Sequence, residues 1–571
     1  MHTPRQKGLN RYTGDTQRTH ATDVLIIGGG PAGTWAAISA AANGASVILV
    51  DKGFCGTSGA TAPSGTGVWY VKPDQDTREH AKASRYEMGG RLAEHAWMDR
   101  VLEQTWTNLH QLAEWGYPFP VDEFGEERRT SLQGPEYMRL MRKRTKAAGV
   151  KILDHSPALE LLVHEDGSVG GATGINRLNG ETWGIRAGAV VMAAGGCAFL
   201  SRALGCNVLT GDGLLMAAET GAELSGMEFS NAYGLGPAFS SVTKSLFYNW
   251  ANFYDATGTL IEGAGSTRGR GIIAQRLQTE PVFARLDRAD PQIQSWMRTA
   301  QPNFFVSFDR RQINPFTDLF PVSLRLEGTV RGTGGLNVVA DDCATNVPGL
   351  YAAGDAATRE LICGGFTGGG SYNAAWALSS GFWAGAGAAR YSRQTKATSP
   401  REIWRAGQTG LPNTKHRPWS AQEVIRQVQA EVFPYTRNWT REGEELNDSL
   451  SRLDALWENI SIGSPLGSAL DVVKAREAAA MLATSRWMYR SALARTETRG
   501  MHRRSDFKTT DPEQRHRITC GGLSDLWTST ASVHDTIATP NMTATATPGT
   551  LLTPHLKNTH TAEHHPELEP T

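Results

Sequence analysis

Residues 23–51 constrain the fold of this chain more than any other segment. An apolar strand ends at Gly28, Gly30 and Gly33, and then a helical stretch leads to a second apolar strand that ends in Asp51. Gly28 permits a tight turn, Gly30 lets backbone amides approach a pyrophosphate, and Gly33 lets the helix pack on the strand. A carboxylate at Asp51 can accept hydrogen bonds from a ribose diol. We therefore predict a βαβ unit that binds an adenine dinucleotide; with 62 glycines in the chain, an ordinary glycine turn is the alternative.

Composition excludes several other functions. With 57 basic and 57 acidic residues the formal net charge is zero, which disfavours binding to nucleic acid or to an anionic membrane surface. The six cysteines are scattered without CxxC spacing, so we expect no haem, iron–sulfur cluster or other metal in this chain. The polar start and the lack of a long apolar stretch predict a soluble cytoplasmic protein with reduced thiols.

The order of patterns along the chain predicts an interrupted nucleotide domain. Residues 151–196 alternate apolar and polar side chains between turn signals, which indicates an antiparallel meander that leads into one long buried strand. Pieces typical of the nucleotide domain recur at 347–389, so the stretch between looks like an inserted second domain. A cleft between the two domains is the natural place for an active site.

We therefore divide the chain into five parts. After residue 400 the periodicity is helical, and the last segment is rich in Thr, Pro and His with no aromatic ring. The predicted parts are a flexible arm at 1–21, a nucleotide-binding domain at 22–224 and 331–395, a capping domain at 225–330, a helical domain at 396–527 and a disordered tail at 528–571.

Several short motifs in fixed order match one protein family. After the glycine turn come SGATAPSG, MAAGG, TGDG, GTGGLNV, VPGLYAAGD, TGGGSYNAA and RTETRGMHRRSD. Over residues 22–510 the chain resembles the flavoprotein subunits of succinate dehydrogenase and fumarate reductase, L-aspartate oxidase and the α subunit of adenylylsulfate reductase. The resemblance implies an α/β fold with a Rossmann-like FAD-binding domain, an inserted α+β capping domain and a C-terminal helical domain. We expect the charged residues of RTETRGMHRRSD to form contacts between domains.

The resemblance implies bound FAD, with the glycines on its pyrophosphate and residues 61–65 along the N5 side of the flavin. Asp355 would meet the ribityl chain, although turn chemistry alone also explains an acid there or at Asp212. Membrane-bound succinate dehydrogenases bond a histidine covalently to the flavin where this chain has Ser58, so we expect noncovalent FAD. The implied FAD contacts beyond the glycines are Asp51, Lys52, Ser58, Gly59, Thr61, Ser64, Gly65, Ala158, Asp212, Asp355, Ser371 and Tyr372.

For catalysis the resemblance places Arg270 as the proton shuttle, with Gly271 where the family usually has an acid. A surface arginine near a helix start is the alternative for Arg270. Two family histidines and one arginine that clamp a dicarboxylate are absent; Tyr233 lies near the first position, Arg331 matches the second as a substrate anchor, and Phe366 replaces the arginine. An unpaired buried carboxylate is unfavourable, so a larger monoanionic or neutral substrate fits better than succinate or fumarate.

We therefore expect an FAD-dependent dehydrogenase or reductase that moves hydride between flavin N5 and a small organic substrate. Two enzymatic alternatives are a flavoprotein like that of adenylylsulfate reductase, working with a separate iron–sulfur partner, and an oxidase that uses O₂. A flavin-binding electron carrier without turnover is the non-enzymatic alternative. The residues leave open the substrate, the direction of reaction, the electron partner and the oligomeric state.

Overall fold

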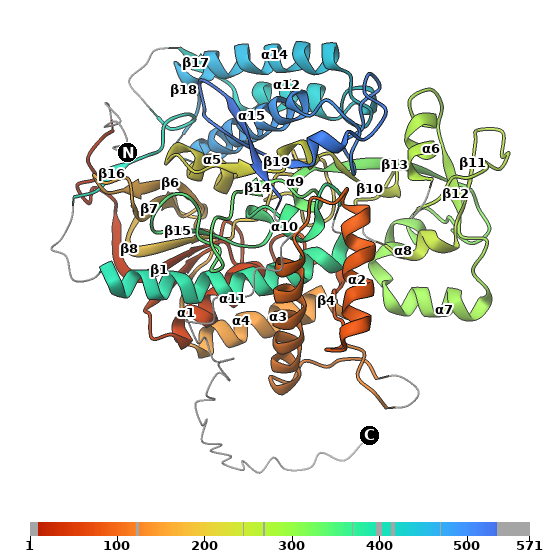
Figure 1. Cartoon of the computed structure of the whole chain (residues 1–571), viewed down its shortest axis with the longest axis horizontal. Helices are drawn as coiled ribbons and strands as arrows, with labels where there is room; N and C mark the ends of the chain where they lie inside the picture. Colours follow the sequence, from red (N-terminus) through yellow and green to blue (C-terminus); the bar gives the residue numbers. More distant parts are fainter. Residues whose placement is uncertain are drawn as a thin grey trace, which may run out of the picture. The chain divides into compact units, whose positions relative to one another are not determined.

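The glycine-rich segment joins strand β1 (Arg18–Ile27) to helix α1 (Pro31–Ala42) in the computed structural model (Figure 1). Strand β1 is buried over its last four residues and pairs in parallel with β2 (Val47–Val50) and β8 (Thr182–Met192). Helix α1 connects β1 to β2, so the predicted βαβ unit is formed. All described residues fall within one unit, Met1–Asp535. The structure describes residues 9–121, 125–243, 245–266, 269–367, 369–395, 402–412, 417–468 and 470–533.

The main sheet has eight strands and mixes parallel with antiparallel pairs. Its order is β16, β6, β7, β8, β1, β2, β5, and β15 also pairs with β8. Strands β6, β7 and β8 form the predicted antiparallel meander, with turns at Gly167 and Gly180, both at positive φ. The predicted α/β fold class is confirmed. The remaining strands are β5 (Lys151–Leu153), β6 (Ala158–Val163), β7 (Val169–Ile175), β15 (Leu350–Ala352) and β16 (Trp404–Arg405).

Helix α11 (Gly369–Thr395) packs against α1 and against β1 and β8 of this sheet (Figure 1). A Cβ atom at Gly381 or Gly385 would overlap with the carbonyl oxygen of Ala32 or Ala36, so glycine is what lets the two helix backbones approach. Helix α3 packs on α11, and α4 packs on α1. These outer elements are α2 (Gln75–Met88), α3 (His95–Glu114), α4 (Gly134–Ala147) and the ribbon of β3 (Gly65–Gly67) and β4 (Ser131–Gln133).

The segment predicted as a cap contains a second, antiparallel sheet with the order β10, β13, β12, β11. Aromatic rings fill the space beneath it: Phe308 lies edge-on to Phe320, with ring centroids 4.8 Å apart, and Phe304 is fully buried. The elements are β10 (Ala232–Pro237), η2 (Phe247–Trp250), β11 (Asn252–Tyr254), α6 (Arg270–Arg276), β12 (Phe283–Arg285), α7 (Pro291–Ala300), α8 (Pro302–Asp309), β13 (Phe320–Glu327) and α9 (Gly328–Arg331).

The described residues from 402 onward contain four α-helices and supply β19 and β20 to a small sheet with the order β14, β9, β19, β20, whose other two strands come from earlier in the chain. The long helix α15 (Asp471–Ala494) packs on α12, α14 and α5. The other elements of this part and of its partners are α5 (Asp212–Glu219), β9 (Leu224–Ser225), η1 (Met227–Phe229), β14 (Gly335–Leu336), η3 (Gly354–Ala356), α10 (Glu360–Cys363), β17 (Pro418–Trp419), α12 (Ala421–Val432), α13 (Tyr435–Asn438), α14 (Gly443–Ser461), β18 (Ser464–Pro465), η4 (Pro512–Gln514), β19 (His516–Gly521) and β20 (Trp527–Ser532).

Two predicted boundaries were wrong. The predicted arm is part of the fold from residue 9 onward, because Tyr12 is buried and its N–H donates to the carbonyl of Ile403 at 2.9 Å, while β1 already begins at Arg18. The predicted tail starts too early, because β20 pairs with β19 as far as Ser532. Residues 1–8 and 534–571 lie outside the described residues. Within the described ranges no helix combines the length and the apolarity needed to cross a membrane.

Buried charges join the C-terminal part to the rest of the chain. Arg495 is fully buried and forms ion pairs with Glu228 at 2.9 Å and with Glu497 at 2.8 Å. The ion pair of Arg495, in the RTETRGMHRRSD stretch, with Glu228 connects parts of the fold that lie far apart in sequence.

Glu360 of α10 is also buried and accepts a hydrogen bond from Ser225 Oγ at 2.7 Å. Burial, and next the nearby Glu228 carboxylate, raise the pKa of Glu360 to about 7 from an ordinary value of 4.5.

This raised pKa makes stability depend on pH. Folded Glu360 holds its proton more tightly than in the unfolded chain, so its contribution is fully present below pH 4.5 and is lost as pH rises through about 7. Glu360→Gln keeps an oxygen that can accept from Ser225 and removes the charge. We expect the variant to melt at a higher temperature than the parent at pH 8, with a smaller difference at pH 5.5. Calorimetry at both pH values measures this, with the exposed Glu445→Gln as control; an equal or lower melting temperature at pH 8 contradicts it.

Candidate functional site

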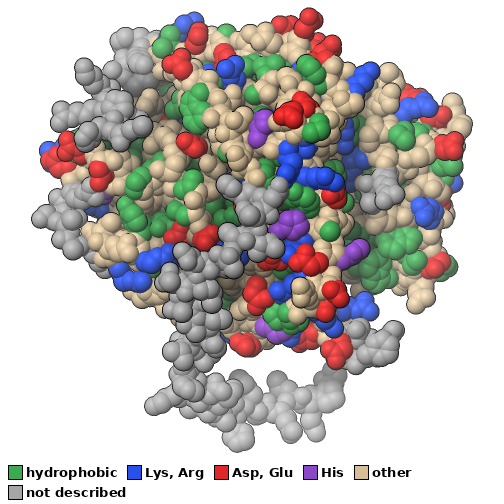
Figure 2. All heavy atoms as spheres, viewed as in Figure 1, with side chains coloured by type: hydrophobic (Ala, Val, Ile, Leu, Met, Phe, Trp, Pro, Cys, Tyr) green, Lys and Arg blue, Asp and Glu red, His purple; other side chains and the backbone are tan. Residues whose placement is uncertain are grey.

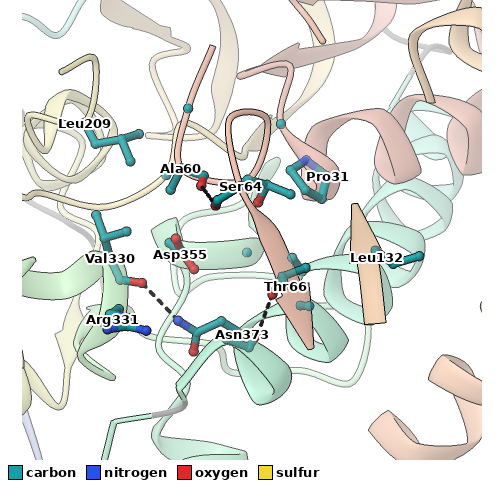
Figure 3. A pocket seen from close by; sticks show the side chains of 18 of the residues that line it. Pro31, Ala60, Ser64, Thr66, Leu132, Leu209, Val330, Arg331, Asp355 and Asn373 are labelled. Atoms are coloured by element: carbon teal, nitrogen blue, oxygen red, sulfur yellow. Dashed lines mark hydrogen bonds between the residues drawn. The ribbon is translucent and has the colours of Figure 1, made fainter. Parts of the chain in front are cut away.

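A cavity of about 790 Å³ extends from the glycine turn to the cap. It lies at the carboxyl ends of β1 and β2, which is where open α/β sheets bind ligands, and its size is typical of a small-molecule site. Figure 3 shows Ser64, Thr66 of β3, and Asp355, Val330 and Arg331 from other segments around this space. The cavity is lined by these sequence-predicted residues: Gly28, Gly30, Asp51, Lys52, Ser58, Gly59, Thr61, Ser64, Gly65, Ala158, Asp212, Arg270, Arg331, Asp355 and Ser371.

The glycine turn is shaped by close backbone contacts. Gly28 has a φ of 112°, and a Cβ atom there would overlap with the carbonyl oxygen of Ala193. A Cβ atom at Gly33 would overlap with the carbonyl oxygen of Gly28, so Gly33 stands where helix and strand pack and does not line the cavity. Gly30 is different, because it precedes α1, has open space around it and faces the cavity. No side chain caps α1, so its first N–H groups are available to an anionic ligand.

Asp51 organises this turn from the end of β2. Its buried carboxylate accepts hydrogen bonds from the N–H groups of Gly29 and Gly53, both at 2.7 Å, and from Ser58 Oγ at 2.7 Å. The side chain thus ties the second strand to the turn as well as lining the cavity. Ser58 stands at the position where relatives with covalently bound flavin are expected to carry histidine. Its hydroxyl donates to Asp51.

Lys52 and Asp212 lie together at the cavity wall. Lys52 Nζ is 2.5 Å from the carboxylate of Asp212 and 2.6 Å from that of Glu477 on α15, and it donates to Thr210 Oγ1 at 2.8 Å. Burial alone would lower the pKa of Lys52, but the two carboxylates outweigh it and the pKa is raised. The lysine is therefore charged, and it links the cavity wall to the C-terminal helices. Nothing in the local sequence indicates Glu477, which comes 425 residues after Lys52.

Asp355 is held by a buried arginine. Arg359 forms an ion pair with Asp355 at 2.7 Å, and its other terminal nitrogen donates to the carbonyl of Thr329 at 2.6 Å and to that of Gly332. These bonds join the segment that carries Arg331 to the segment that carries Asp355. Asn373 adds a further link, because its amide nitrogen donates to the carbonyl of Val330 at 3.0 Å (Figure 3).

The two predicted catalytic arginines, Arg270 and Arg331, line the cavity at its cap end. Arg270 is part-buried and donates to the carbonyls of Ser266 at 2.9 Å and Tyr233 at 3.2 Å. The pKa of Arg270 is lowered from 12.5 to about 10, mainly by burial and to a smaller extent by the positive charge of Arg331. Arg331 Nε lies 3.2 Å from the carboxylate of Glu327, which is fully buried.

Besides Gly33, three predicted residues, among them Tyr372, whose backbone amide is the expected flavin contact, do not line the cavity. Tyr233 packs between Tyr435 and Trp439 and donates to the carbonyl of Val432 at 3.3 Å, so that its ring faces the C-terminal part. Tyr372 packs on Trp69, with ring centroids 4.8 Å apart, and on the guanidinium of Arg85. Phe366 belongs to a hydrophobic cluster with Leu92, Phe229, Ala232 and Met501.

Sequence reasoning missed other residues of the lining. Phe247, Tyr248 and Trp296 face the cavity from the cap, and Thr66 and Asn373 face it from the nucleotide-binding part. The aromatic-rich stretch SLFYNWANFY was a usable signal for the first two. Trp296 gives no such signal, because it lies on a helix whose contact with the cavity depends on the tertiary fold.

Comparisons with known proteins agree with this geometry. Residues 23–232 match the model of the FAD binding domain, and residues 436–543 match that of the fumarate reductase flavoprotein C-terminal region. The chain is 26% identical over 542 residues to one of the subunits of the fumarate reductase (CoM/CoB) of Methanothermobacter marburgensis, covering 87% of this chain and 96% of that protein. It is 24% identical over 533 residues to L-aspartate oxidase of Streptomyces coelicolor, covering 86% and 90%.

The fold has close counterparts among solved structures. A variant of Escherichia coli quinol fumarate reductase superimposes with a TM-score of 0.77 at 20% identity, covering 91% of this chain and 98% of that chain. The chain thus carries an FAD-binding domain and a fumarate reductase flavoprotein C-terminal region, and fumarate reductase flavoproteins and L-aspartate oxidases are among its homologues. It is an FAD-dependent oxidoreductase, and FAD is its cofactor. The open space at Gly30 and the uncapped start of α1 fit the pyrophosphate of this cofactor.

Gly30→Val tests where the cofactor binds. The added side chain meets no protein atom within 4 Å of its Cβ position and the backbone φ is ordinary, so the fold should persist while the phosphate site is filled. We expect the purified variant to hold less than about a tenth of the FAD of the parent, measured as the ratio of flavin to protein absorbance. Gly271→Val is the matched control, since that position is also open. Unchanged FAD content in Gly30→Val would contradict this placement.

Proposed function

We propose that this FAD-dependent oxidoreductase transfers a hydride between the flavin and a small organic substrate that is not a C4 dicarboxylate. The observation that carries the proposal is that Arg270 and Arg331 line the same cavity as the glycine turn. The substrate would lie between the flavin and the cap, with its anionic or carbonyl group toward Arg331. A guanidinium is suited to this task because it can bind a carboxylate with two parallel hydrogen bonds.

Bound FAD supplies the ring that accepts or donates the hydride. The residues expected to hold it are the FAD contacts named from the sequence that line the cavity, from Gly28 and Gly30 to Asp355 and Ser371. With Ser58 in place of a histidine, its hydroxyl donating to Asp51, we propose that the cofactor is bound noncovalently.

Arg270 would hold the proton that accompanies the hydride. Its lowered pKa, about 10, brings the guanidinium closer to releasing a proton, yet at pH 7 it is still protonated by about a thousandfold. The residue therefore starts as a proton donor, which is the role required when the substrate is reduced. Two carbonyl oxygens, of Ser266 and Tyr233, orient the guanidinium.

A separate electron-transfer protein is the second part of the proposal. The relative from Methanothermobacter marburgensis, which this chain matches over most of its length, is named as a component of a larger enzyme. We propose that this chain likewise exchanges electrons with a separate partner, whose identity copurification under mild conditions would establish.

The test of the proposed reaction is reoxidation of the reduced protein. The yellow holoprotein is reduced anaerobically with dithionite and mixed with fumarate, adenylylsulfate, enones, unsaturated monoacids or air while flavin absorbance is followed. We expect rapid reoxidation by an unsaturated monoacid or enone and slow reoxidation by fumarate. Fumarate as the fastest acceptor contradicts the exclusion of dicarboxylates. Reoxidation by air alone favours an oxidase, and a protein without turnover toward any compound favours an electron carrier.

Arg270→Met tests the proton shuttle. The variant removes the proton donor and keeps a long side chain, so we expect the FAD content of the parent and reoxidation by the identified acceptor at least about 100-fold slower, the usual range for loss of a general acid. Arg276→Met, on the exposed side of the same helix, is the control and should retain the parent rate. A rate in Arg270→Met equal to that of the parent would remove Arg270 from the mechanism.

A further inference from the structure

The cap side of the cavity is aromatic. Phe247 and Tyr248 of η2 and Trp296 of α7 all line it, and the rings of Phe247 and Trp296 lie edge to face with centroids 6.0 Å apart. Phe247 is almost fully buried, while Trp296 is 49% exposed. An apolar wall that includes the half-exposed ring of Trp296 therefore faces the space in which the substrate is proposed to lie.

This wall is adjacent to the arginine end of the cavity. Arg270 donates to the carbonyl of Ser266 at 2.9 Å, and Ser266 Oγ donates to Asn249 Oδ1, also at 2.9 Å. Asn249 belongs to η2, the same short helix that carries Phe247 and Tyr248. Two hydrogen bonds thus connect a cationic group to the aromatic wall, and Ser266 and Asn249 both line the cavity. A ligand that fills this end meets a positive charge and an apolar surface together.

Packing of the cap explains part of the aromatic cluster and leaves another part unexplained. Phe304, Phe305 and Phe308 are buried and form the core of the cap. Leu246 is 71% exposed and Trp296 49% exposed, and both are in the lining. Figure 2 shows hydrophobic side chains gathered at the right of the view, over the region of α7 and α8. Large apolar side chains exposed at the border of a cavity are typical of a ligand-binding surface.

We propose that the substrate is an organic acid that carries a bulky apolar group, preferably an aromatic ring. Its acid group would lie toward Arg270 and Arg331, and its apolar group would cover Phe247, Trp296 and Leu246. This inference rests on the proposed function, since it names the substrate class of the same site. A short diacid fits poorly, because its second carboxylate would lose water against the aromatic wall without gaining a partner there.

Ligand binding to the oxidised holoprotein tests the proposal without turnover. The probes are 3-phenylacrylate, crotonate and fumarate, with dissociation constants from isothermal titration and from the change in flavin absorbance. We expect 3-phenylacrylate to bind at least about tenfold more tightly than crotonate, and fumarate to bind most weakly. In Trp296→Ala the affinity for 3-phenylacrylate should fall about tenfold, while that for crotonate should change less than about twofold. Trp527→Ala, a half-exposed tryptophan on β20 outside the lining, is the control and should behave as the parent.

The outcomes separate this inference from the proposed function. Equal affinities for the two monoacids, tightest binding of fumarate, binding of none of the probes, or no effect of Trp296→Ala would each overturn the substrate class. Leu246→Ser is a second variant for the same comparison should Trp296→Ala lose its FAD. If reduced protein is reoxidised by organic acceptors while the probes show no preference for the aromatic acid, the proposed function stands and this inference fails. If the holoprotein shows the preference but transfers no hydride to any acceptor, the proposed function fails.

Discussion

The turn between β1 and α1 is the constraint on which the rest of the structure depends. Gly28 adopts a positive φ directly against the carbonyl of Ala193 at the end of β8, and Gly29 donates its N–H to the carboxylate of Asp51 at the end of β2. Three strand ends therefore meet at one point, and none of them can move without disturbing the other two. A side chain at Gly28 would push β8 away and open the sheet. The contacts at this point leave the start of α1 uncovered, and the cavity lies in front of it.

The cap end of the cavity depends on charges that come from elsewhere in the chain. Arg359 pairs with Asp355 and donates to carbonyls of the segment from Thr329 to Gly332, and so the position of Arg331 is set by the nucleotide-binding part as well as by the cap. Such a fully buried guanidinium is tolerated because both of its terminal nitrogens gain a carboxylate or carbonyl partner in place of water. Removal of Arg359 would leave several buried carbonyls without a donor and release the arginine-bearing segment.

Much of this architecture could be predicted from sequence because it rests on local patterns. The βαβ unit follows from glycine spacing between apolar runs, and the meander of β6, β7 and β8 follows from alternation between turn signals. Tyr12 could not be recognised as buried, because its partner Ile403 comes nearly 400 residues later and polar neighbours surround it in sequence. The same applies to Glu477 beside Lys52. For Tyr233 the residue type suggested a substrate wall, but the alternation of strand β10 turns its ring toward Tyr435 and Trp439.

Although glycine follows Arg270 in sequence, a buried carboxylate from strand β13 acts on the same arginine. Gly271 stands where relatives are expected to have a carboxylate, while Glu327 at the end of β13 is fully buried beside Arg331 and raises the pKa of Arg270 against the effect of burial. Gly234 on the neighbouring strand makes room for this side chain, since a Cβ atom there would overlap with the carboxylate, and Thr243 donates a hydrogen bond to it. The single carboxylate of Glu327 lies near two guanidinium groups, those of Arg331 and Arg270. The three groups together therefore carry a net positive charge. An anionic substrate would neutralise that charge, and this charge balance is one reason for our proposal that an acid group binds at this end of the cavity.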